Sequence, residues 1–168
     1  ALALPERAAD HLRIARDVYR HLGISALELF KLRRMEGREL QELVHLEGME
    51  HFERALSRER GVVVVTAHFG NFDLLACSQA ARGVPLAIVS RELHGSASNR
   101  FWMETRRASG LTIFRDGGSA RELLKWLREG KVLGLVVDQR TGSSRGGIRC
   151  DFLGGRAWTT TAPARLAT

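Results

Sequence analysis

Two side chains with complementary chemistry stand five residues apart in the stretch VVVVTAHFGNFDLL, residues 62–75. His68 follows four consecutive valines, and Asp73 lies just beyond the next turn signal, a glycine followed by an asparagine. A carboxylate that accepts a hydrogen bond from one imidazole nitrogen fixes the tautomer of the ring and makes the other nitrogen more basic. Such a base can take a proton from a substrate hydroxyl, which then attacks without a serine or cysteine of the protein. The spacing therefore favours His68 as a general base that Asp73 orients.

The same residues also have a structural interpretation. His68 can be a turn histidine, and Asp73 can be a carboxylate that stabilises the positive end of a helix dipole. Asn71 is predicted to cap that helix, because a side-chain oxygen at this position accepts a free backbone N–H. The hexapeptide alone leaves both interpretations open.

The elements around this stretch predict where it lies. Four short apolar runs, mostly β-branched, are predicted to be buried strands at residues 62–65, 86–89, 111–114 and 132–137. Helical patterns separate them at residues 72–81, 96–109 and 119–128. Alternating strands and helices predict an α/β fold, with a mostly parallel central sheet flanked by helices. Ligands of such sheets bind at the carboxyl ends of the strands, where His68 lies. Asp138 and Gln139 end the fourth run and are therefore expected near His68 across the sheet.

The first sixty residues predict a helical N-terminal segment. Apolar residues recur every three or four positions from Pro5, Gly23 is predicted to end this helix, and Ser25 is predicted to cap the next. A third short helix is expected after Gly48. We predict a single domain over residues 1–168, with a helical part at 1–59 and an α/β part at 60–168. The chain is expected to be a fragment, since it begins without methionine and ends within a helical pattern.

Composition limits the classes of partner and site. The 26 Lys and Arg exceed the 19 Asp and Glu, so a net charge of +7 suits phospholipid head groups, nucleic acid or an acidic carrier protein. The two cysteines, Cys77 and Cys150, have no metal-ligand spacing, so neither a disulfide framework nor a metal site is predicted. No apolar run approaches the roughly 18 residues of a spanning helix. The glycines of residues 142–155 fit no nucleotide-binding pattern and predict either a loop over the site or ordinary turns.

Several blocks in the same order carry a resemblance to a known family. HFGNFD after a valine-rich strand resembles the acyltransferase signature of the lysophospholipid acyltransferase superfamily, and in particular the branch that acylates lipid A with lauroyl or myristoyl groups. AIVSRELHGSASNRFWMETRRASGLTIF is similar to the second block of that branch, and VLGLVVDQR to its Asp-Gln block. Asp73 stands where glutamate is common in this branch. Aspartate occurs in related enzymes that acylate mannosylated phosphatidylinositol.

The resemblance implies a membrane-associated acyltransferase at the cytoplasmic face of the bacterial inner membrane. It would move a fatty acyl group from acyl carrier protein or acyl-CoA to a hydroxyl of a glycolipid such as a lipid A precursor, without a cofactor or metal. It implies His68 and Asp73 as catalytic residues, and it places in the substrate site Asn71, Arg91, Arg106, Asp138 and Gln139. The arginines would bind the anionic acceptor or the developing oxyanion.

Two alternatives remain at this point. The acceptor could instead be a lysophospholipid, an ornithine lipid or a phosphatidylinositol mannoside. The chain could also be a non-catalytic basic α/β module that binds membrane or nucleic acid, although no RNA-binding signature accompanies Phe101 and Trp102, and no nucleic acid is expected.

Overall fold

A four-stranded parallel sheet forms the centre of the protein in a computed structural model, which describes residues 10–35, 37–91, 97–139, 141–142, 146–152 and 154–168. Its strands are β1 (Val62–Thr66), β2 (Leu86–Ser90), β3 (Thr112–Arg115) and β4 (Val132–Val136), in the order β1-β4-β2-β3. The connecting helices are α4 (Phe72–Ala81), α5 (Ala97–Ala108) and α6 (Ala120–Arg128). The predicted α/β fold is confirmed, and each predicted strand or helix of this part differs from the observed one by no more than a residue at either end.

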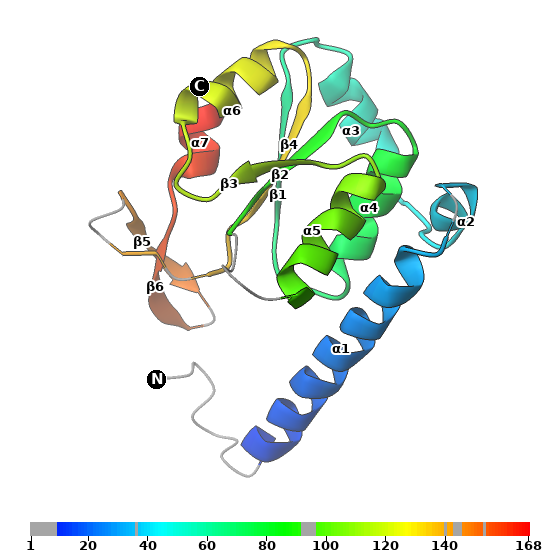
Figure 1. The fold of residues 1–168 in the computed structure, drawn as a ribbon. Coiled ribbons are helices and arrows are strands. Elements are labelled where there is room, and N and C mark those ends of the chain that lie inside the picture. The colour runs from blue at the N-terminus through cyan, green and yellow to red at the C-terminus, as the bar shows by residue number, and fades with distance from the viewer. Residues whose placement is uncertain (1–9, 36, 92–96, 140, 143–145, 153) are drawn as a thin grey trace.

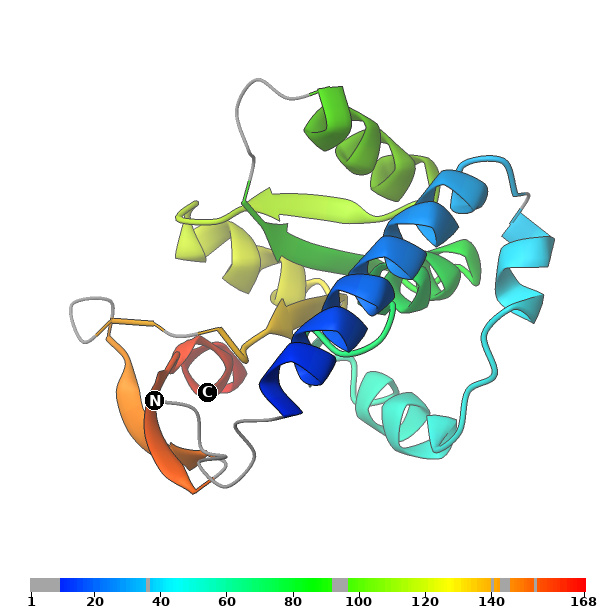
Figure 2. The same ribbon diagram turned by 90° about the horizontal axis from the view of Figure 1, so that it is seen from below.

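The sheet is covered on both faces, and the residues of its strands alternate between the two layers (Figures 1 and 2). Leu86 and Val132 pack with Cys77 of α4 and with residues of the N-terminal helices. The next residue of each strand, Ala87 and Leu133, points to the other side and packs with Leu127 of α6. This period of two is the geometry of an extended strand, and it gives each face of the sheet its own hydrophobic cluster.

The valine run differs from the other strands in its burial. We expected a fully buried strand, but β1 is an edge of the sheet and pairs only with β4. Val64 and Val65 are 36% and 53% exposed, because an edge strand has a neighbouring strand on one side alone.

The N-terminal segment is helical, as predicted, but is divided differently. Helix α1 (His11–Leu32) runs unbroken through Gly23, where the sequence predicted a helix end and a new cap at Ser25. A glycine inside a helix costs only about 1 kcal/mol relative to alanine, so it does not by itself end a long apolar stripe. Residues 1–9, where this helix was predicted to begin, lie outside the described residues. Helix α3 (Met49–Leu56) confirms the third prediction, and α2 (Gly37–Glu42) was not predicted.

The C-terminal part contains a β-hairpin that was not predicted from the glycine-rich sequence. Strands β5 (Ile148–Phe152) and β6 (Gly155–Thr159) pair antiparallel, and α7 (Ala162–Ala167) follows and packs near β1. Gly154, with φ +76°, lies in the turn of this hairpin, so at this position ordinary turns, one of the two predictions for the glycines of residues 142–155, describe the segment. Residues 143–145 and 153 of the segment lie outside the described residues. Among the described residues, no helix combines the length and the hydropathy needed to span a bilayer.

One glycine fixes the entry to β1. Gly61 has φ +74°, and a β-carbon at this position would collide with the backbone of Leu127 at the end of α6. Glycine is the residue that tolerates both the left-handed backbone and the close approach. Gly61 therefore sets the start of the strand that carries His68 at its far end.

Candidate active site

His68 and Asp138 meet because two adjacent parallel strands end level with each other. Strands β1 and β4 are in register, with Thr66 opposite Val136 at their carboxyl ends. His68 and Asp138 each lie two residues further along their strands. The predicted proximity of Asp138 to His68 is therefore confirmed, and it follows from strand order and register.

The Asp138 carboxylate makes two hydrogen bonds to His68. Its Oδ1 lies 2.8 Å from the ring Nδ1, and its Oδ2 accepts the backbone N–H of His68 at 3.0 Å. Because an ionised carboxylate only accepts, the ring donates from Nδ1, which leaves Nε2 as the proton acceptor. Desolvation acts to raise the pKa of Asp138, but the hydrogen bonds from the ring and backbone of His68 outweigh it and hold that pKa below its ordinary value. Asp138 therefore remains a carboxylate that orients the ring.

A short turn connects His68 to helix α4. Gly70 adopts φ +58°, which glycine tolerates without strain, and Asn71 then caps the helix by accepting the backbone N–H of Leu74 at 2.9 Å. The amide of Asn71 donates to Glu28 of α1 at 2.7 Å. The ring of Phe72 meets the His68 ring edge-on, at a centroid distance of 4.9 Å. Asn71 is thus a capping and anchoring residue in this structure, and its predicted place in the substrate site remains a prediction.

Asp73 does not orient His68 in this structure. Its carboxylate accepts Nε of Arg106 at 2.7 Å through Oδ1 and the indole N–H of Trp102 at 3.0 Å through Oδ2. Asp73 lies in the first turn of α4 and is 5% exposed, so its side chain points into the interface with α5 instead of towards the strand ends. The expectation that Asp73 accepts the hydrogen bond from His68 was wrong about the partner, since Asp138 accepts it. A catalytic role for Asp73 remains a prediction.

Arg106 is a buried member of the same network. It is 7% exposed, and its Nη1 also donates to Ser90 at the end of β2, at 3.0 Å. Its guanidinium lies 5.1 Å from the centre of the Trp102 ring. The sequence predicted that Arg106 contacts an acceptor head group. In this conformation the guanidinium is buried and bonded to Asp73 and Ser90, so it is not accessible to a head group. That role remains a prediction.

Arg91 and Gln139 lie beyond the carboxyl ends of strands β2 and β4. Arg91 follows β2 and donates to Oδ2 of Asp116 through Nε at 3.2 Å and Nη2 at 3.0 Å. Asp116 follows β3, the neighbour of β2 in the sheet. Arg91 and Asp116 therefore form a pair between the ends of two adjacent strands, as His68 and Asp138 do at the ends of β1 and β4. Arg91 and Gln139 are both exposed, and substrate binding by either remains a prediction.

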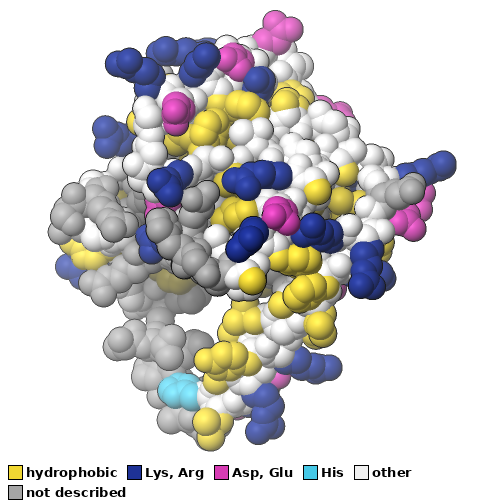
Figure 3. Space-filling model, viewed as in Figure 1, with side chains coloured by type: hydrophobic (Ala, Val, Ile, Leu, Met, Phe, Trp, Pro, Cys, Tyr) yellow, Lys and Arg dark blue, Asp and Glu magenta, His cyan; other side chains and the backbone are white. Residues whose placement is uncertain are grey.

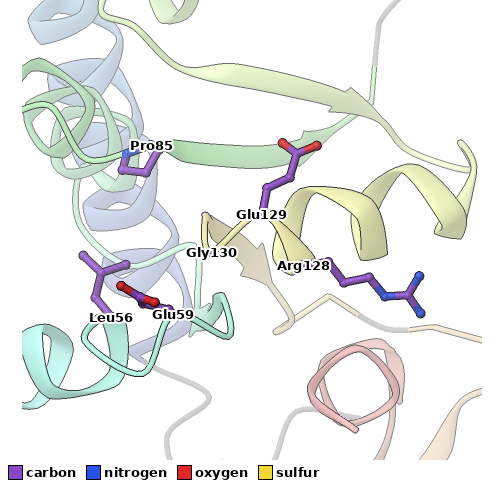
Figure 4. Close-up of a pocket in the computed structure, with 6 residues that line it drawn as sticks. All are labelled: Leu56, Glu59, Pro85, Arg128, Glu129 and Gly130. Atoms are coloured by element: carbon purple, nitrogen blue, oxygen red, sulfur yellow. The ribbon is translucent and has the colours of Figure 1, made fainter.

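An open pocket of about 510 Å³ lies at the amino ends of the strands, on the opposite side of the sheet from His68. It is lined by residues that precede the strands, among them Leu56, Pro85 and Gly130 (Figure 4). The strand ends that carry His68 and Asp138 do not contribute to it. Within the described ranges, no three His, Cys, Asp or Glu side chains gather closely enough to hold a metal ion.

Sequence reasoning missed several partners at this site, among them Trp102, Glu28 and Asp116. Trp102 and Glu28 are reached only through helix packing, for which the chain carries no local signal. Asp116 follows the third strand directly, and the rule about carboxyl ends of parallel strands was enough to identify it.

Comparison with known proteins identifies a family and two similar proteins. The sequence model of the family described as bacterial lipid A biosynthesis acyltransferase matches residues 1–168. A phosphatidylinositol mannoside acyltransferase of Mycolicibacterium smegmatis (strain ATCC 700084 / mc(2)155) is 26% identical over 144 residues, which cover 83% of this chain and 47% of that protein. A phosphatidylinositol mannoside acyltransferase of Mycobacterium tuberculosis (strain CDC 1551 / Oshkosh) is 25% identical over 146 residues, which cover 83% of this chain and 46% of that protein. The chain therefore spans about half the length of the curated relatives it matches.

The family match extends over the strand ends, the His68 turn and the helices that hold them. With its full 168 residues matched, this chain belongs to the bacterial lipid A biosynthesis acyltransferase family.

Proposed function

We propose that this protein transfers a fatty acyl group from a thioester to a hydroxyl of a membrane glycolipid, with His68 as the general base. The observation that carries the proposal is the 2.8 Å contact between Nδ1 of His68 and Asp138, which leaves Nε2 free to accept a proton. The ring is partly exposed at the carboxyl edge of a parallel sheet, where a substrate can reach it.

The reaction then proceeds in two proton-balanced steps. Nε2 of His68 removes the proton of the acceptor hydroxyl while its oxygen attacks the thioester carbonyl, and a tetrahedral oxyanion forms. The carbon–sulfur bond then breaks, the carbonyl re-forms, and the leaving thiolate takes the proton from Nε2. Throughout, Asp138 stabilises the imidazolium that exists between the two proton transfers.

The acceptor is proposed to be an anionic glycolipid. Arg91 is exposed at the same ends of the strands, and the N–H groups of its guanidinium that do not bond to Asp116 can donate to a phosphate. The family description favours a lipid A precursor, and the names of the similar mycobacterial proteins favour a phosphatidylinositol mannoside as a second candidate. The donor is proposed to be acyl carrier protein or acyl-CoA, at the cytoplasmic face of the inner membrane.

The test is thiol release from an acyl thioester in the presence of membrane lipid extract. His68→Ala is expected to lower the rate by about a hundredfold or more, the usual contribution of a general base. Asp138→Asn is expected to lower it to a similar extent, because an amide can hold the ring in the opposite tautomer. His51→Ala is the matched control, since His51 is an exposed histidine on α3 with a carboxylate neighbour of its own.

Retained turnover in His68→Ala with unchanged folding would contradict the assignment of the base. Absence of thiol release by the parent protein with either donor would favour the non-catalytic module instead. Mass spectrometry of the acylated product identifies the acceptor, including a lysophospholipid or ornithine lipid should one be used.

A further inference from the structure

Helix α1 has one packed half and one half that projects from the protein. In its C-terminal half, Leu29 and Leu32 are buried at 5% and 4% exposure in the core beside α4. In its N-terminal half, Leu12 is 82% exposed, Tyr19 76% and Leu22 59%. These residues recur at helical spacing, so they form a continuous apolar stripe on one side of the helix. Figure 3 shows hydrophobic side chains along this part of α1, on the side away from its basic residues.

The polar side of the same half is basic. Arg13, Arg16 and Arg20 repeat at steps of three and four residues and share a face that the apolar stripe does not occupy. Long arginine side chains beside an apolar stripe can lay their methylene groups on it and hold their charge at the level of lipid phosphates. An apolar face flanked by arginines is the pattern of a helix that lies in the plane of an anionic lipid surface.

We propose that the N-terminal half of α1 docks the protein on an anionic lipid surface, through the stripe formed by Leu12, Val18, Tyr19 and Leu22. The inference rests on the proposed function, since it names the surface from which the acyl acceptor comes. The positive charge of Arg13, Arg16 and Arg20 favours an anionic lipid surface over a second copy of the chain as the partner of the stripe. Pairing of two copies would bury the stripe but would bring the arginines of both helices together, whereas anionic lipid neutralises them.

The docked helix is connected directly to the catalytic turn. Glu28 of α1 accepts the amide of Asn71, and Asn71 caps the helix that follows the His68 turn. Arg33, the residue that follows α1, forms an ion pair with Glu104 of α5 at 3.0 Å. The contacts hold the projecting stripe in a fixed position relative to the edge of the sheet where His68 lies.

Vesicle co-sedimentation tests the proposal without catalysis. The protein is mixed with vesicles of phosphatidylcholine alone and of phosphatidylcholine with phosphatidylglycerol. We expect binding to the anionic vesicles, and the combined change Leu12→Ser, Tyr19→Ser and Leu22→Ser is expected to weaken it about tenfold or more. The three side chains are exposed, so the variant should keep its fold, which circular dichroism checks. Ile148→Ser with Phe152→Ser is the control, because these apolar residues are also exposed, at 52% and 57%, but belong to β5, and we expect it to bind like the parent.

A second variant tests the electrostatic part. Arg13→Gln, Arg16→Gln and Arg20→Gln together should reduce the preference for anionic over neutral vesicles. Equal binding of the serine variant and the parent, or equal binding of the parent to both vesicle types, would overturn the proposal. So would a parent dimer in sedimentation velocity that the serine substitutions dissociate, since the stripe would then be an interface between copies.

A last comparison separates this proposal from the proposed function. The serine variant should retain thiol release with an acceptor dispersed in detergent and lose it with the same acceptor in vesicles. Equal loss in both would place the stripe in the catalytic site and overturn its assignment as a docking surface, whereas an inactive parent would count against the proposed function alone.

Discussion

Asp138 makes two hydrogen bonds to the same residue, one to the ring of His68 and one to its main chain. The main-chain bond fixes where the ring is attached, and the ring bond fixes which way it faces. A carboxylate placed in this way defines the position of Nε2 without touching the substrate. At the scale of the residue, the site is one oriented imidazole.

The pH dependence of this pair has a definite sign. The pKa of Asp138 is lowered in the folded protein, so its contribution to stability is present above its unfolded pKa and is lost as the pH falls through its folded pKa. In His68→Ala, the pKa of Asp138 should rise towards its ordinary value, but only partway, because the backbone N–H of residue 68 still donates. Carbon-13 NMR titration of the carboxyl groups measures the change.

Glu129 provides the internal control for that titration. Its pKa is lowered by the hydrogen bond from Lys131. Both residues lie at the amino ends of the strands, far from His68, so the pKa of Glu129 should not change in His68→Ala. An Asp138 titration that is identical in the parent and the variant would contradict the 2.8 Å contact.

At the scale of the elements, the Asp73 network joins α4, α5 and the end of β2. Asp73 contributes from α4, Arg106 and Trp102 from α5, and Ser90 from β2. Ionised groups at this depth are stable only as a pair, since a lone buried charge carries a large desolvation cost. The network therefore fixes α5 beside the helix that begins at the His68 turn.

Removing one member of the buried pair should destabilise the whole domain. Asp73→Ala leaves the Arg106 guanidinium buried without its carboxylate, and we expect a loss of about 3–5 kcal/mol in the free energy of unfolding. Urea unfolding followed by circular dichroism measures it. The matched control is Arg33→Ala, which breaks the exposed ion pair with Glu104 and should change stability by less than about 1 kcal/mol. Similar losses in both variants would mean that burial adds nothing to the Asp73 pair.

The same network shows where sequence reasoning succeeds and where it ends. Phe72–Ala81 was predicted to the residue, because a capping asparagine and an apolar pattern are local signals. The partner of His68 was not, because a five-residue spacing suggested Asp73, while strand order selected Asp138 from 70 residues away. The residues that neighbour His68 depend on the strand order, in which β4 lies between β1 and β2. No local sequence pattern predicts that order.

At the scale of the whole molecule, the two cysteines report on different parts of the fold. Cys77 lies on the core side of α4 with no exposed surface, and burial raises the pKa of its thiol. Cys150 lies half-buried in the β5–β6 hairpin. Both effects make Cys77 unreactive, since the thiolate is the reacting species.

Thiol labelling in increasing urea should therefore separate the hairpin from the domain. Cys150 is expected to react in the native protein, whereas Cys77 should react only in step with the global loss of circular dichroism. The Cys150→Ser variant isolates the second signal. Rapid labelling of Cys77 without denaturant would show that the layer between α4 and the sheet opens on its own.

The strand order has a consequence for how the protein acquires its chemistry. Along the chain, β1, β2 and β3 come first, yet β1 has no partner among them, and the sheet stays in two pieces until β4 enters between β1 and β2. The strand that completes the sheet is also the strand that carries Asp138. Closing a loop of this length is entropically costly and is repaid only when the strand docks. During synthesis or refolding, chains without a docked β4 would hold His68 without its carboxylate, so the gain of an oriented base and the completion of the sheet are a single folding event.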